Sequence, residues 1–483
     1  MFHPKVIFRI VGILLFFEAM FLLCSVPVAM YYSEPVEAIL WSVATMVGIG
    51  TILTYICRSA GRDVSRKDGY IIVTLIWIIF SLFGTLPYML SGCITNFTDA
   101  FFETMSGFTT TGASILFDIE SLPKSLLFWR SMTHWIGGLG IVFFMVAVFP
   151  IFGFGEMHLF AAESVGPMKT KLHPRISVTA RWILTVYIGL TVLATVAYFI
   201  CGMGWFDAIC HSMSTVSTGG FSTKQDSILA FNSPLIEYVV TLFMFLGGVS
   251  LSLQYLLLFK GRLRELFRDT EFRTYLGIVL GFTAVITVGL LLTSDTGFEE
   301  SFRTSIFQVV ALQTTTGFVT ANYVMWMPLL WLLLCALMFF GACSGSTSGA
   351  MKCVRVATLF KVMWNEFKRI VHPNAVIPVR MAGKIVPTGV QSAILAYTVI
   401  YIFVLIVGLF VNMGFGLDFL DAFGLSVTSV GNVGPGLGHY GPMDSFASLP
   451  SPLKWFSAFQ MLVGRLEFFA VLLLFTPIFW KRR

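Results

Sequence analysis

Four stretches of the chain repeat one short pattern: TDAFFETMSGFTTTGAS at 98–114, FDAICHSMSTVSTGGFS at 206–222, RTSIFQVVALQTTTGFV at 303–319 and LDAFGLSVTSVGNVGPG at 420–436. Aligned without gaps, they share one glycine, which is Gly112, Gly220, Gly317 or Gly434. Thirteen residues before it stand Asp99, Asp207, Thr304 and Asp421. A pattern that recurs in this way indicates one structural unit built four times.

Each stretch predicts a short helix followed by an irregular turn. Asp and Thr are favoured as helix N-caps, because their side-chain oxygens accept hydrogen bonds from unpaired N–H groups. The next ~10 residues suit a helix that crosses only part of a membrane, since a full span needs about 20. The shared glycine follows, where unusual backbone conformations cost least. We therefore expect four pore-helix N-caps, at Asp99, Asp207, Thr304 and Asp421.

The composition indicates a membrane protein. Of the 483 residues, 57% are hydrophobic and 12% are charged, and the mean hydropathy is +0.85. Soluble domains carry about 25% charged residues, so the composition excludes a soluble enzyme, a disordered chain and a nucleic-acid-binding protein. Membrane lipids would surround most of the surface. The eight cysteines form no CxxC pair and support neither a zinc site nor a disulfide framework.

Ten stretches are apolar and long enough to be spanning helices. They cover residues 8–30, 36–57, 69–90, 126–152, 179–202, 234–259, 273–293, 326–350, 390–413 and 453–480. Cytoplasmic loops of membrane proteins carry an excess of Lys and Arg. With both termini in the cytoplasm, all but six of the 31 Lys and Arg fall on the inner side. The six others are Lys124, Arg130, Lys224, Arg303, Lys454 and Arg465.

The four patterned loops each lie between two spans. We therefore predict an all-α polytopic membrane protein with ten transmembrane helices. Four M1–pore loop–M2 repeats would have pseudo-fourfold symmetry and follow two extra N-terminal helices. The predicted boundaries are 1–66 for the extra helices, then 67–160, 161–262, 263–388 and 389–483 for the repeats. The third repeat includes a basic cytoplasmic segment at 352–384.

The loops after the short helices are the candidate functional site. Irregular backbone at membrane depth is tolerated only where it is buried in protein or lines a water-filled cavity. Four loops around one axis would present a ring of carbonyl oxygens, which can replace the water around a potassium ion. The alternative is that Gly and Thr serve only as turn residues at loop tips, but four copies in register favour a filter. The predicted potassium-binding residues are Thr110, Thr111, Gly112, Thr218, Gly219, Gly220, Thr315, Thr316, Gly317, Asn432, Val433 and Gly434.

The second spans also align, as HWIGGLG (134–140), MFLGGVS (244–250), FFGACSG (339–345) and MLVGRLE (461–467). Gly137, Gly247, Gly341 and Gly464 correspond, and Arg465 aligns with Gly138, Gly248 and Ala342. A charge at mid-bilayer costs at least about 2.5–3.5 kcal/mol. We therefore interpret Arg465 as a cation that constricts the pore or braces the filter. The alternative is an arginine that snorkels or pairs with a carboxylate.

The third repeat carries GACSGSTSGA at 341–350, inside an otherwise apolar span. Glycine costs about 0.8–1.0 kcal/mol per helical position relative to alanine, so this stretch predicts a break in the helix and a gate below the filter. The alternative is close helix packing by small residues. The predicted gate residues are Gly341, Ser344, Gly345, Ser346, Thr347, Ser348, Gly349 and Arg465.

Other chemistries find less support. GACSG matches a nucleophile-elbow pattern, which requires a strand-to-helix turn and a histidine partner. Here the sequence interrupts an apolar helix instead. We predict no catalytic residue and no enzyme activity. The main rival is a proton-coupled transporter, which needs carboxylates deep in its spans; outside the repeats, Glu18 is the one candidate.

The motifs together resemble a known family. TTTGA, STGGF, TTTGF and NVGPG, with HWIGGLGI, GACSGSTSGAMKCVRV, VHPNAV and GRLEFF, are similar to the membrane subunit of the bacterial Trk potassium-uptake systems, within the Trk/Ktr/HKT superfamily. The resemblance covers nearly the whole chain. It departs from the family at Ser348, where a glycine is common.

This resemblance implies a homodimer in the bacterial inner membrane and potassium as the transported ion, with no cofactor on this chain. It also implies a cytosolic, TrkA-like ring of nucleotide-binding subunits with RCK domains, for which the basic stretch 352–384 is the expected docking surface. The interrupted helix and Arg465 would gate the path. In the superfamily, serine at the first filter glycine accompanies sodium preference, so the four glycines here imply potassium.

Overall fold

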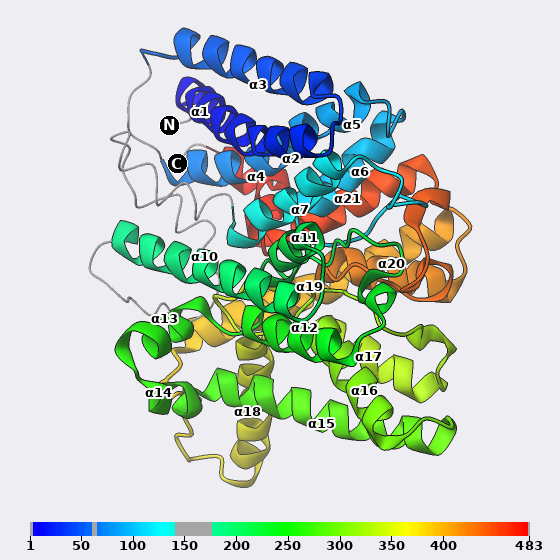
Figure 1. Ribbon diagram of the computed structural model, residues 1–483. Helices are drawn as coiled ribbons and strands as arrows, with labels where there is room; N and C mark the ends of the chain where they lie inside the picture. Colours follow the sequence, from blue (N-terminus) through cyan, green and yellow to red (C-terminus); the bar gives the residue numbers. More distant parts are fainter. Residues whose placement is uncertain (1–2, 60–64, 141–175, 482–483) are drawn as a thin grey trace.

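The computed structural model describes residues 3–59, 65–140 and 176–481. Their regular secondary structure is almost entirely helical (Figure 1). Within them, strands are limited to the antiparallel pair β1 (Arg380–Met381) and β2 (Lys384–Ile385). The prediction of an all-α membrane fold is confirmed.

The two extra N-terminal spans pack against each other. They comprise α1 (Pro4–Leu23) with its continuation α2 (Ser25–Tyr31), and α3 (Glu37–Ile56). The contact depends on Gly12 and Gly50, because a Cβ on either one would come within 2.9 Å of the other's carbonyl oxygen. Small residues allow membrane helices to approach closely in this way.

Each repeat contains a first helix, a short pore helix and a second helix. The first helices are α4 (Arg66–Gly84) with α5 (Leu86–Leu90), α10 (Ile176–Ile200), α15 (Thr270–Thr293) and α19 (Thr388–Gly414). The pore helices are α6 (Phe97–Phe108), α11 (Trp205–Val216), α16 (Phe298–Gln313) and α20 (Phe419–Gly431). The second helices are α7 (Lys124–Leu139), α12 (Pro234–Gly247), α17 (Pro328–Phe340) and α21 (Ser451–Arg465).

The remaining helices lie after the second helices and in the loops. After the second helices come α13 (Leu251–Lys260), α14 (Leu263–Arg268), α18 (Cys353–Val371), α22 (Phe469–Leu472), η6 (Leu473–Phe475) and α23 (Pro477–Trp480). The loops after the pore helices contain η2 (Ser227–Phe231), η3 (Tyr323–Met325), η4 (Gly438–Tyr440) and η5 (Phe446–Ser448).

The second helices bend within two of the predicted spans, 234–259 and 453–480. In the second repeat α12 and α13 meet at 102°, and in the fourth α21 meets Phe469–Phe475 at 111°. Both helices end at or next to their aligned glycine, against which the end of a pore helix lies. The sequence analysis did not predict these bends, whereas the break predicted at 341–350 separates α17 from α18.

Part of the first repeat's second span lies outside the described residues. That part is 141–152 of the predicted span 126–152, and the predicted boundary between 160 and 161 lies there too. Among the described residues, six helices are long and apolar enough to span a membrane, or eight if each bent pair is one span. The count of ten helices stays a prediction.

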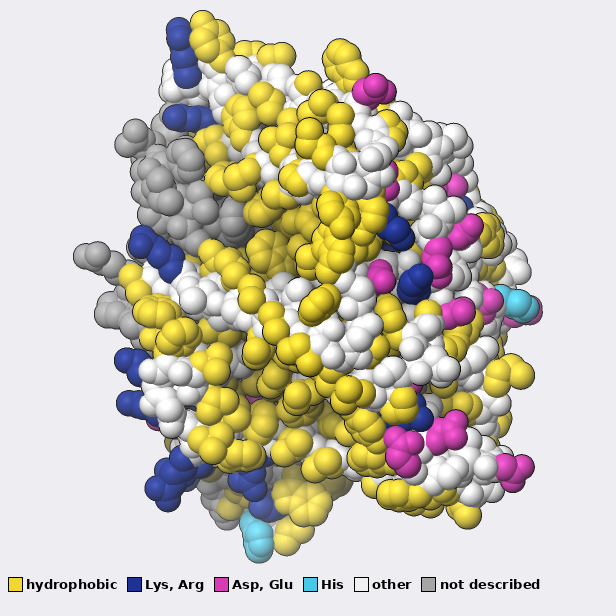
Figure 2. Space-filling model, viewed as in Figure 1, with side chains coloured by type: hydrophobic (Ala, Val, Ile, Leu, Met, Phe, Trp, Pro, Cys, Tyr) yellow, Lys and Arg dark blue, Asp and Glu magenta, His cyan; other side chains and the backbone are white. Residues whose placement is uncertain are grey.

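The charged residues divide between two edges of the molecule. In Figure 2, Lys and Arg gather along the edge on which both chain ends lie in Figure 1, most Asp and Glu lie toward the opposite edge, and hydrophobic side chains cover the width between them. A broad apolar band between two charged rims is the surface that a bilayer requires.

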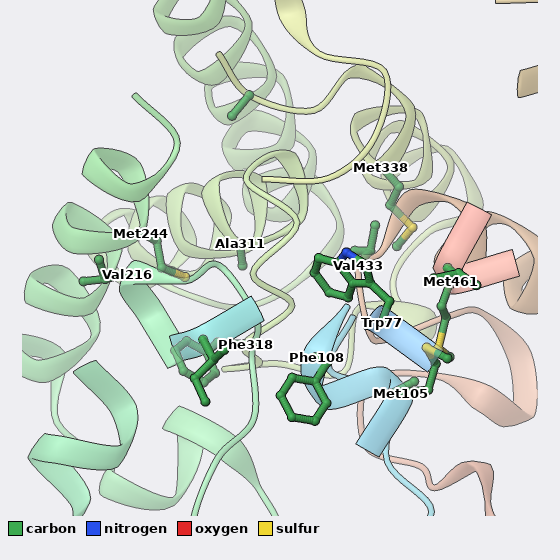
Figure 3. Packing of buried hydrophobic residues seen from close by; sticks show 14 of the residues in the cluster. Trp77, Met105, Phe108, Val216, Met244, Ala311, Phe318, Met338, Val433 and Met461 are labelled. Atoms are coloured by element: carbon green, nitrogen blue, oxygen red, sulfur yellow. The ribbon is translucent and has the colours of Figure 1, made fainter. Parts of the chain in front are cut away.

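The buried core draws on all four repeats. The residues labelled in Figure 3 include Phe108 from the first repeat, Met244 from the second, Met338 from the third and Met461 from the fourth. Met244, Met338 and Met461 occupy the same position of three second helices, three residues before the aligned glycine. The repeats therefore share one core and do not form separate domains.

Candidate functional site

The loops that follow the four pore helices meet at one cavity of about 80 Å³. Its lining includes all four shared glycines: Gly112, Gly220, Gly317 and Gly434. Their φ angles are +83°, +84°, +73° and +104°, a region that residues with a side chain rarely adopt. The structure thus brings together residues that lie about a hundred or more positions apart in the chain.

The shared glycines contact one another's loops in cyclic order. A Cβ on Gly112 would lie 2.7 Å or less from the carbonyl oxygen of Gly219, in the second repeat. The same holds for Gly220 with Thr316, Gly317 with Val433, and Gly434 with Thr111. Each glycine therefore lies against the residue that precedes the next repeat's glycine, and the fourth repeat closes on the first. We call these four contacts the glycine ring.

The residues that precede the shared glycines turn their N–H groups away from the glycine ring. Each N–H donates to a carbonyl oxygen five residues earlier, near the end of its own pore helix. The four bonds are Thr111 to Ser106 (2.9 Å), Gly219 to Ser214 (2.8 Å), Thr316 to Ala311 (2.9 Å) and Val433 to Thr428 (3.1 Å). The same residues place their carbonyl oxygens in the glycine ring.

A second feature that the four loops share is a residue with a left-handed backbone conformation two positions before each glycine. The φ angles are +54° at Thr110, +53° at Thr218, +57° at Thr315 and +53° at Asn432. Asparagine tolerates this region, but a β-branched residue there is strained. The sequence prediction included these residues without their conformation; the asparagine at 432, aligned with three threonines, is the one signal for it.

Side-chain hydroxyls of the loops form hydrogen bonds within one loop and between neighbouring loops. Thr109 and Thr111 are 2.8 Å apart at their hydroxyl oxygens, and Thr314 and Thr316 repeat that contact at 2.7 Å. The Asn432 amide donates to the Thr111 hydroxyl at 3.0 Å and thereby joins the fourth loop to the first.

The aligned glycines of the second helices receive the pore-helix ends. A Cβ at Gly137 or Gly464 would clash with the carbonyl oxygen of Phe108 or Val430, and at Gly247 it would lie 3.6 Å from that of Val216. These three carbonyls occupy equivalent positions in their repeats. Glycine is therefore required at this position in the first and fourth repeats, whereas Gly247 makes ordinary van der Waals contact with the equivalent carbonyl.

The broken stretch of the third repeat lies against three of the loops. The Gly349 N–H donates to the Thr315 hydroxyl at 2.7 Å, and the Ala350 N–H donates to the carbonyl of Gly431 at 3.0 Å. The Thr347 hydroxyl donates to the carbonyl of Val216 at 3.0 Å. Residues 341–352, which we call the intramembrane loop, thus contact the second, third and fourth repeats.

Contacts within the intramembrane loop involve its serines and a buried lysine. The Ser346 hydroxyl donates to the Cys343 carbonyl at 2.5 Å and lies 3.0 Å from the Ser348 hydroxyl. The Ser344 N–H donates to Glu271 of α15, also at 2.5 Å. The Lys352 ammonium, 4% exposed, donates to the Ser348 carbonyl. Our sequence prediction missed Lys352, although it is the first cation after the glycine–serine run.

Arg465 joins the intramembrane loop to the first repeat. Its guanidinium donates to the carbonyl of Thr347 at 2.8 Å and to those of Gly137 and Gly138 at 2.6 and 3.3 Å. These acceptors agree with a bracing cation.

The prediction of the pore-helix N-caps is wrong. The caps are Asn96, Gly204, Gly297 and Asp418, so each helix begins before the aligned residue. Asp99, Asp207 and Asp421 lie in the first turn, where they bind the Lys454 ammonium, the Thr223 hydroxyl and His439. Thr304 lies further along α16. An aspartate within the first turn still favours the positive end of the helix dipole.

Comparison with known proteins places the chain in a family. The profile of the TrkH family, described as "Cation transport protein", matches residues 36–482. The Trk system potassium uptake protein TrkH of Salmonella typhimurium is 38% identical, covering 99% of this chain and 100% of that protein. TrkG of Escherichia coli K12 is 34% identical, with 99% of each chain covered.

A solved structure agrees with the sequence matches. The crystal structure of the potassium transporter TrkH from Vibrio parahaemolyticus superposes with a TM-score of 0.90 at 33% identity, covering 99% of this chain and 100% of that one. With its four loops and glycine ring, the chain belongs to the TrkH family of cation transport proteins.

Proposed function

We propose that this chain is the membrane subunit of a Trk-type potassium uptake system of the bacterial inner membrane. Its four loops would form the selectivity filter. The observation that carries the proposal is the glycine ring, in which four equivalent carbonyls and four equivalent glycines alternate, and whose glycines line one cavity. The related TrkH and TrkG proteins are named as potassium uptake proteins.

The chemistry follows from which groups meet in the glycine ring. In this proposal, the carbonyls of Thr111, Gly219, Thr316 and Val433 replace the water around a dehydrated potassium ion. Their N–H groups bond to the pore helices, so hydrogen-bond donors are turned away from the cation. The pore helices end beside the loops, and the negative ends of their dipoles add attraction for a cation.

The intramembrane loop and Arg465 form the proposed gate. Opening requires residues 341–350 to leave Thr315, Gly431 and Val216, and Arg465 to release Thr347. We propose that a cytosolic nucleotide-binding ring of the RCK type drives this change, and that the subunit is a homodimer. The basic edge of the molecule, where both termini lie, would face the cytoplasm.

Rubidium uptake into proteoliposomes tests the filter. The Gly220→Ser variant should lower the ratio of Rb⁺ to Na⁺ permeability, because a side chain there meets the Thr316 carbonyl. Gly189→Ser is the matched control, since α10 leaves open space at that glycine. An unchanged ratio in folded Gly220→Ser protein would contradict the assignment.

A proton-coupled mechanism is the second candidate, and Glu18 is the observation that favours it. Glu18 is fully buried in α1, and neither carboxylate oxygen has a hydrogen-bond partner among the described residues. Buried carboxylates within spans often belong to proton relays. Uptake that stops when the pH gradient is collapsed, and that no longer responds to it in Glu18→Gln, would support coupling.

A further inference from the structure

One position of the pore helices has a role that the filter proposal does not include. Nine residues before the shared glycine stand Glu103, His211, Gln308 and Leu425. All four are buried, with exposures of 1% or less. Three of them are polar, and each polar side chain reaches forward to the exit of its own filter loop.

The three polar contacts end at equivalent places. Glu103 accepts from the Ser114 hydroxyl at 3.0 Å and from the Ile115 N–H at 2.9 Å, two and three residues after Gly112. The ring of His211 lies 2.9 Å from the hydroxyl oxygen of Ser222, two residues after Gly220.

Gln308 makes the same connection in the third repeat. Its amide oxygen, in the orientation that satisfies the whole group, accepts from the Thr320 N–H at 3.0 Å and the Ala321 N–H at 3.3 Å. A carboxylate, an imidazole and an amide therefore each bond to the residues that follow the shared glycine of their own repeat. We call the side chains of Glu103, His211 and Gln308, with these contacts, the straps.

The fourth repeat holds its exit differently. Leu425 has no polar atom in its side chain, and the exit residue Gly436 instead donates to the Tyr440 carbonyl at 2.8 Å and accepts from the Tyr323 hydroxyl at 3.0 Å. This repeat supplies an internal control, because its pore helix lacks the strap.

Arg130 couples the straps of the first two repeats. Its Nε donates to Glu103 at 2.7 Å, and its Nη1 donates to the Ser222 carbonyl at 2.9 Å. Arg130 and Glu103 are 2% and 1% exposed, and the guanidinium lies 3.5 Å from the centre of the Phe221 ring. A buried ion pair without additional hydrogen bonds is costly; this one uses its remaining atoms to hold two filter exits.

We propose that Glu103, His211 and Gln308 are positioning residues for ion discrimination, and that Arg130 links the first two. The proposal rests on the filter proposed above. A carbonyl cage selects ions by the number and placement of its oxygens. A strap that holds the peptide two or three residues beyond the shared glycine limits how far the glycine ring can relax around a smaller ion.

The test compares loss of a strap with exchange of one strap for another. Gln308→Leu and His211→Leu install the residue type of the fourth repeat, whereas Gln308→His and His211→Gln install the strap of a neighbouring repeat. Leu425→Met is the control without a strap. Rb⁺ and Na⁺ fluxes are measured in proteoliposomes, and thermal unfolding in detergent reports folding.

We expect the Rb⁺/Na⁺ permeability ratio to fall about two- to tenfold in the Leu variants, the range that corresponds to the net loss of one hydrogen bond. The exchange variants should retain the wild-type ratio to within about twofold, as should Leu425→Met. If the Leu variants do not fold, Gln308→Asn withdraws the amide by one methylene group and should lower the ratio in the same direction.

Two outcomes would overturn the proposal. One is an unchanged ratio in folded strap variants, with only stability reduced; the other is an equal fall of the ratio in Leu425→Met. Failure of the filter itself is distinguishable, because Gly220→Ser would then also leave the ratio unchanged. If the Rb⁺/Na⁺ ratio falls in Gly220→Ser but not in the strap variants, the strap proposal is refuted and the filter proposal stands.

Discussion

At the scale of single residues, each loop contains a glycine with a positive φ, and three of the four loops also contain a threonine with a positive φ, which is a strained conformation for threonine. Thr110, Thr218 and Thr315 adopt the left-handed region in which Asn432 also lies. Strain of about 1–3 kcal/mol per residue persists only where the surroundings impose it. The hydrogen bonds from the loop N–H groups to the pore helices supply that constraint.

Thr218→Asn should therefore stabilise the protein by about 1 kcal/mol, because asparagine tolerates the left-handed region better than threonine. The Thr218 hydroxyl donates to the neighbouring Ser217 carbonyl, which the asparagine amide could also reach. Thermal unfolding in detergent measures the effect. Thr185→Asn, at an exposed position of α10, should not stabilise; equal shifts in both variants would refute the role of strain.

Arg465→Ala should raise ion flux in the absence of any partner, because the carbonyls of Thr347, Gly137 and Gly138 lose their shared donor. Each buried acceptor left unpaired costs about 1–3 kcal/mol. Arg465→Lys should show an intermediate flux, since an ammonium lacks the planar fork of a guanidinium. Proteoliposome flux measures both, and wild-type flux in the alanine variant would exclude a role in gating.

At the scale of elements, the spans and loops were predictable and the bends were not. Apolar length and the repeated pattern sufficed to locate α10, α15, α19 and the four pore helices. The bends after α12 and α21 occur where pore-helix ends lie against Gly247 and Gly464, and that contact is not evident from local sequence. The break in the third repeat was predictable because its cause, three glycines among serines, is local.

The site shows the same limit. Alignment of the repeats was enough to predict an unusual backbone conformation at the four shared glycines, because glycine is the residue type that adopts such conformations at least cost. The N-caps were misplaced because Asp418 and Asp421 are equally good caps, and the choice depends on where the preceding chain enters. The column Glu103, His211, Gln308 and Leu425 was visible in the alignment, but its unlike side chains gave no common chemistry before their contacts were known.

Deletion of Gly345–Gly349 should raise basal flux, because it removes the residues that contact Thr315 and Val216. Rubidium uptake without the regulatory partner is the measurement. Replacement of the same five residues by alanines, which keeps the length, is the matched comparison and should raise flux less. Unchanged flux after the deletion would identify the segment as packing only.

The loop after the fourth filter segment should make stability depend on pH. His439 is exposed, and hydrogen bonding to the Asp421 side chain, together with its charge, raises the pKa of the imidazole. A raised pKa in the folded state means that the contact stabilises fully below the ordinary histidine pKa and is lost as pH rises through the folded value. Thermal stability should therefore fall slightly as the pH rises above the ordinary histidine pKa of about 6.5, and His439→Gln should remove that part of the slope. The same slope in both proteins would contradict the assignment.

At the scale of the whole molecule, side-chain pairs join the repeats across their borders. Lys454 of α21 and Asp99 of α6 connect the fourth repeat to the first at 2.6 Å, and Arg303 of α16 and Glu237 of α12 connect the third to the second at 2.7 Å. The Arg130 bond to Ser222 joins the first to the second. These side-chain contacts join neighbouring repeats in addition to the main-chain contacts of the glycine ring.

Lys454→Met should destabilise the protein by about 2 kcal/mol, because Asp99 is left without its cation. The value lies below that of a fully buried pair, since Asp99 is 24% exposed. Adding Asp99→Asn should recover part of the loss, and thermal unfolding of the single and double variants measures the coupling. Strict additivity would show that the two residues do not interact.

The closure of the fourth loop on the first has a consequence for biosynthesis. Gly434 meets the carbonyl of Thr111 only after the ribosome has added more than three hundred further residues. Until then the loops of the first and third repeats each lack one neighbour. The glycine ring is therefore completed late in synthesis, and a chain that ends before the fourth loop cannot form it.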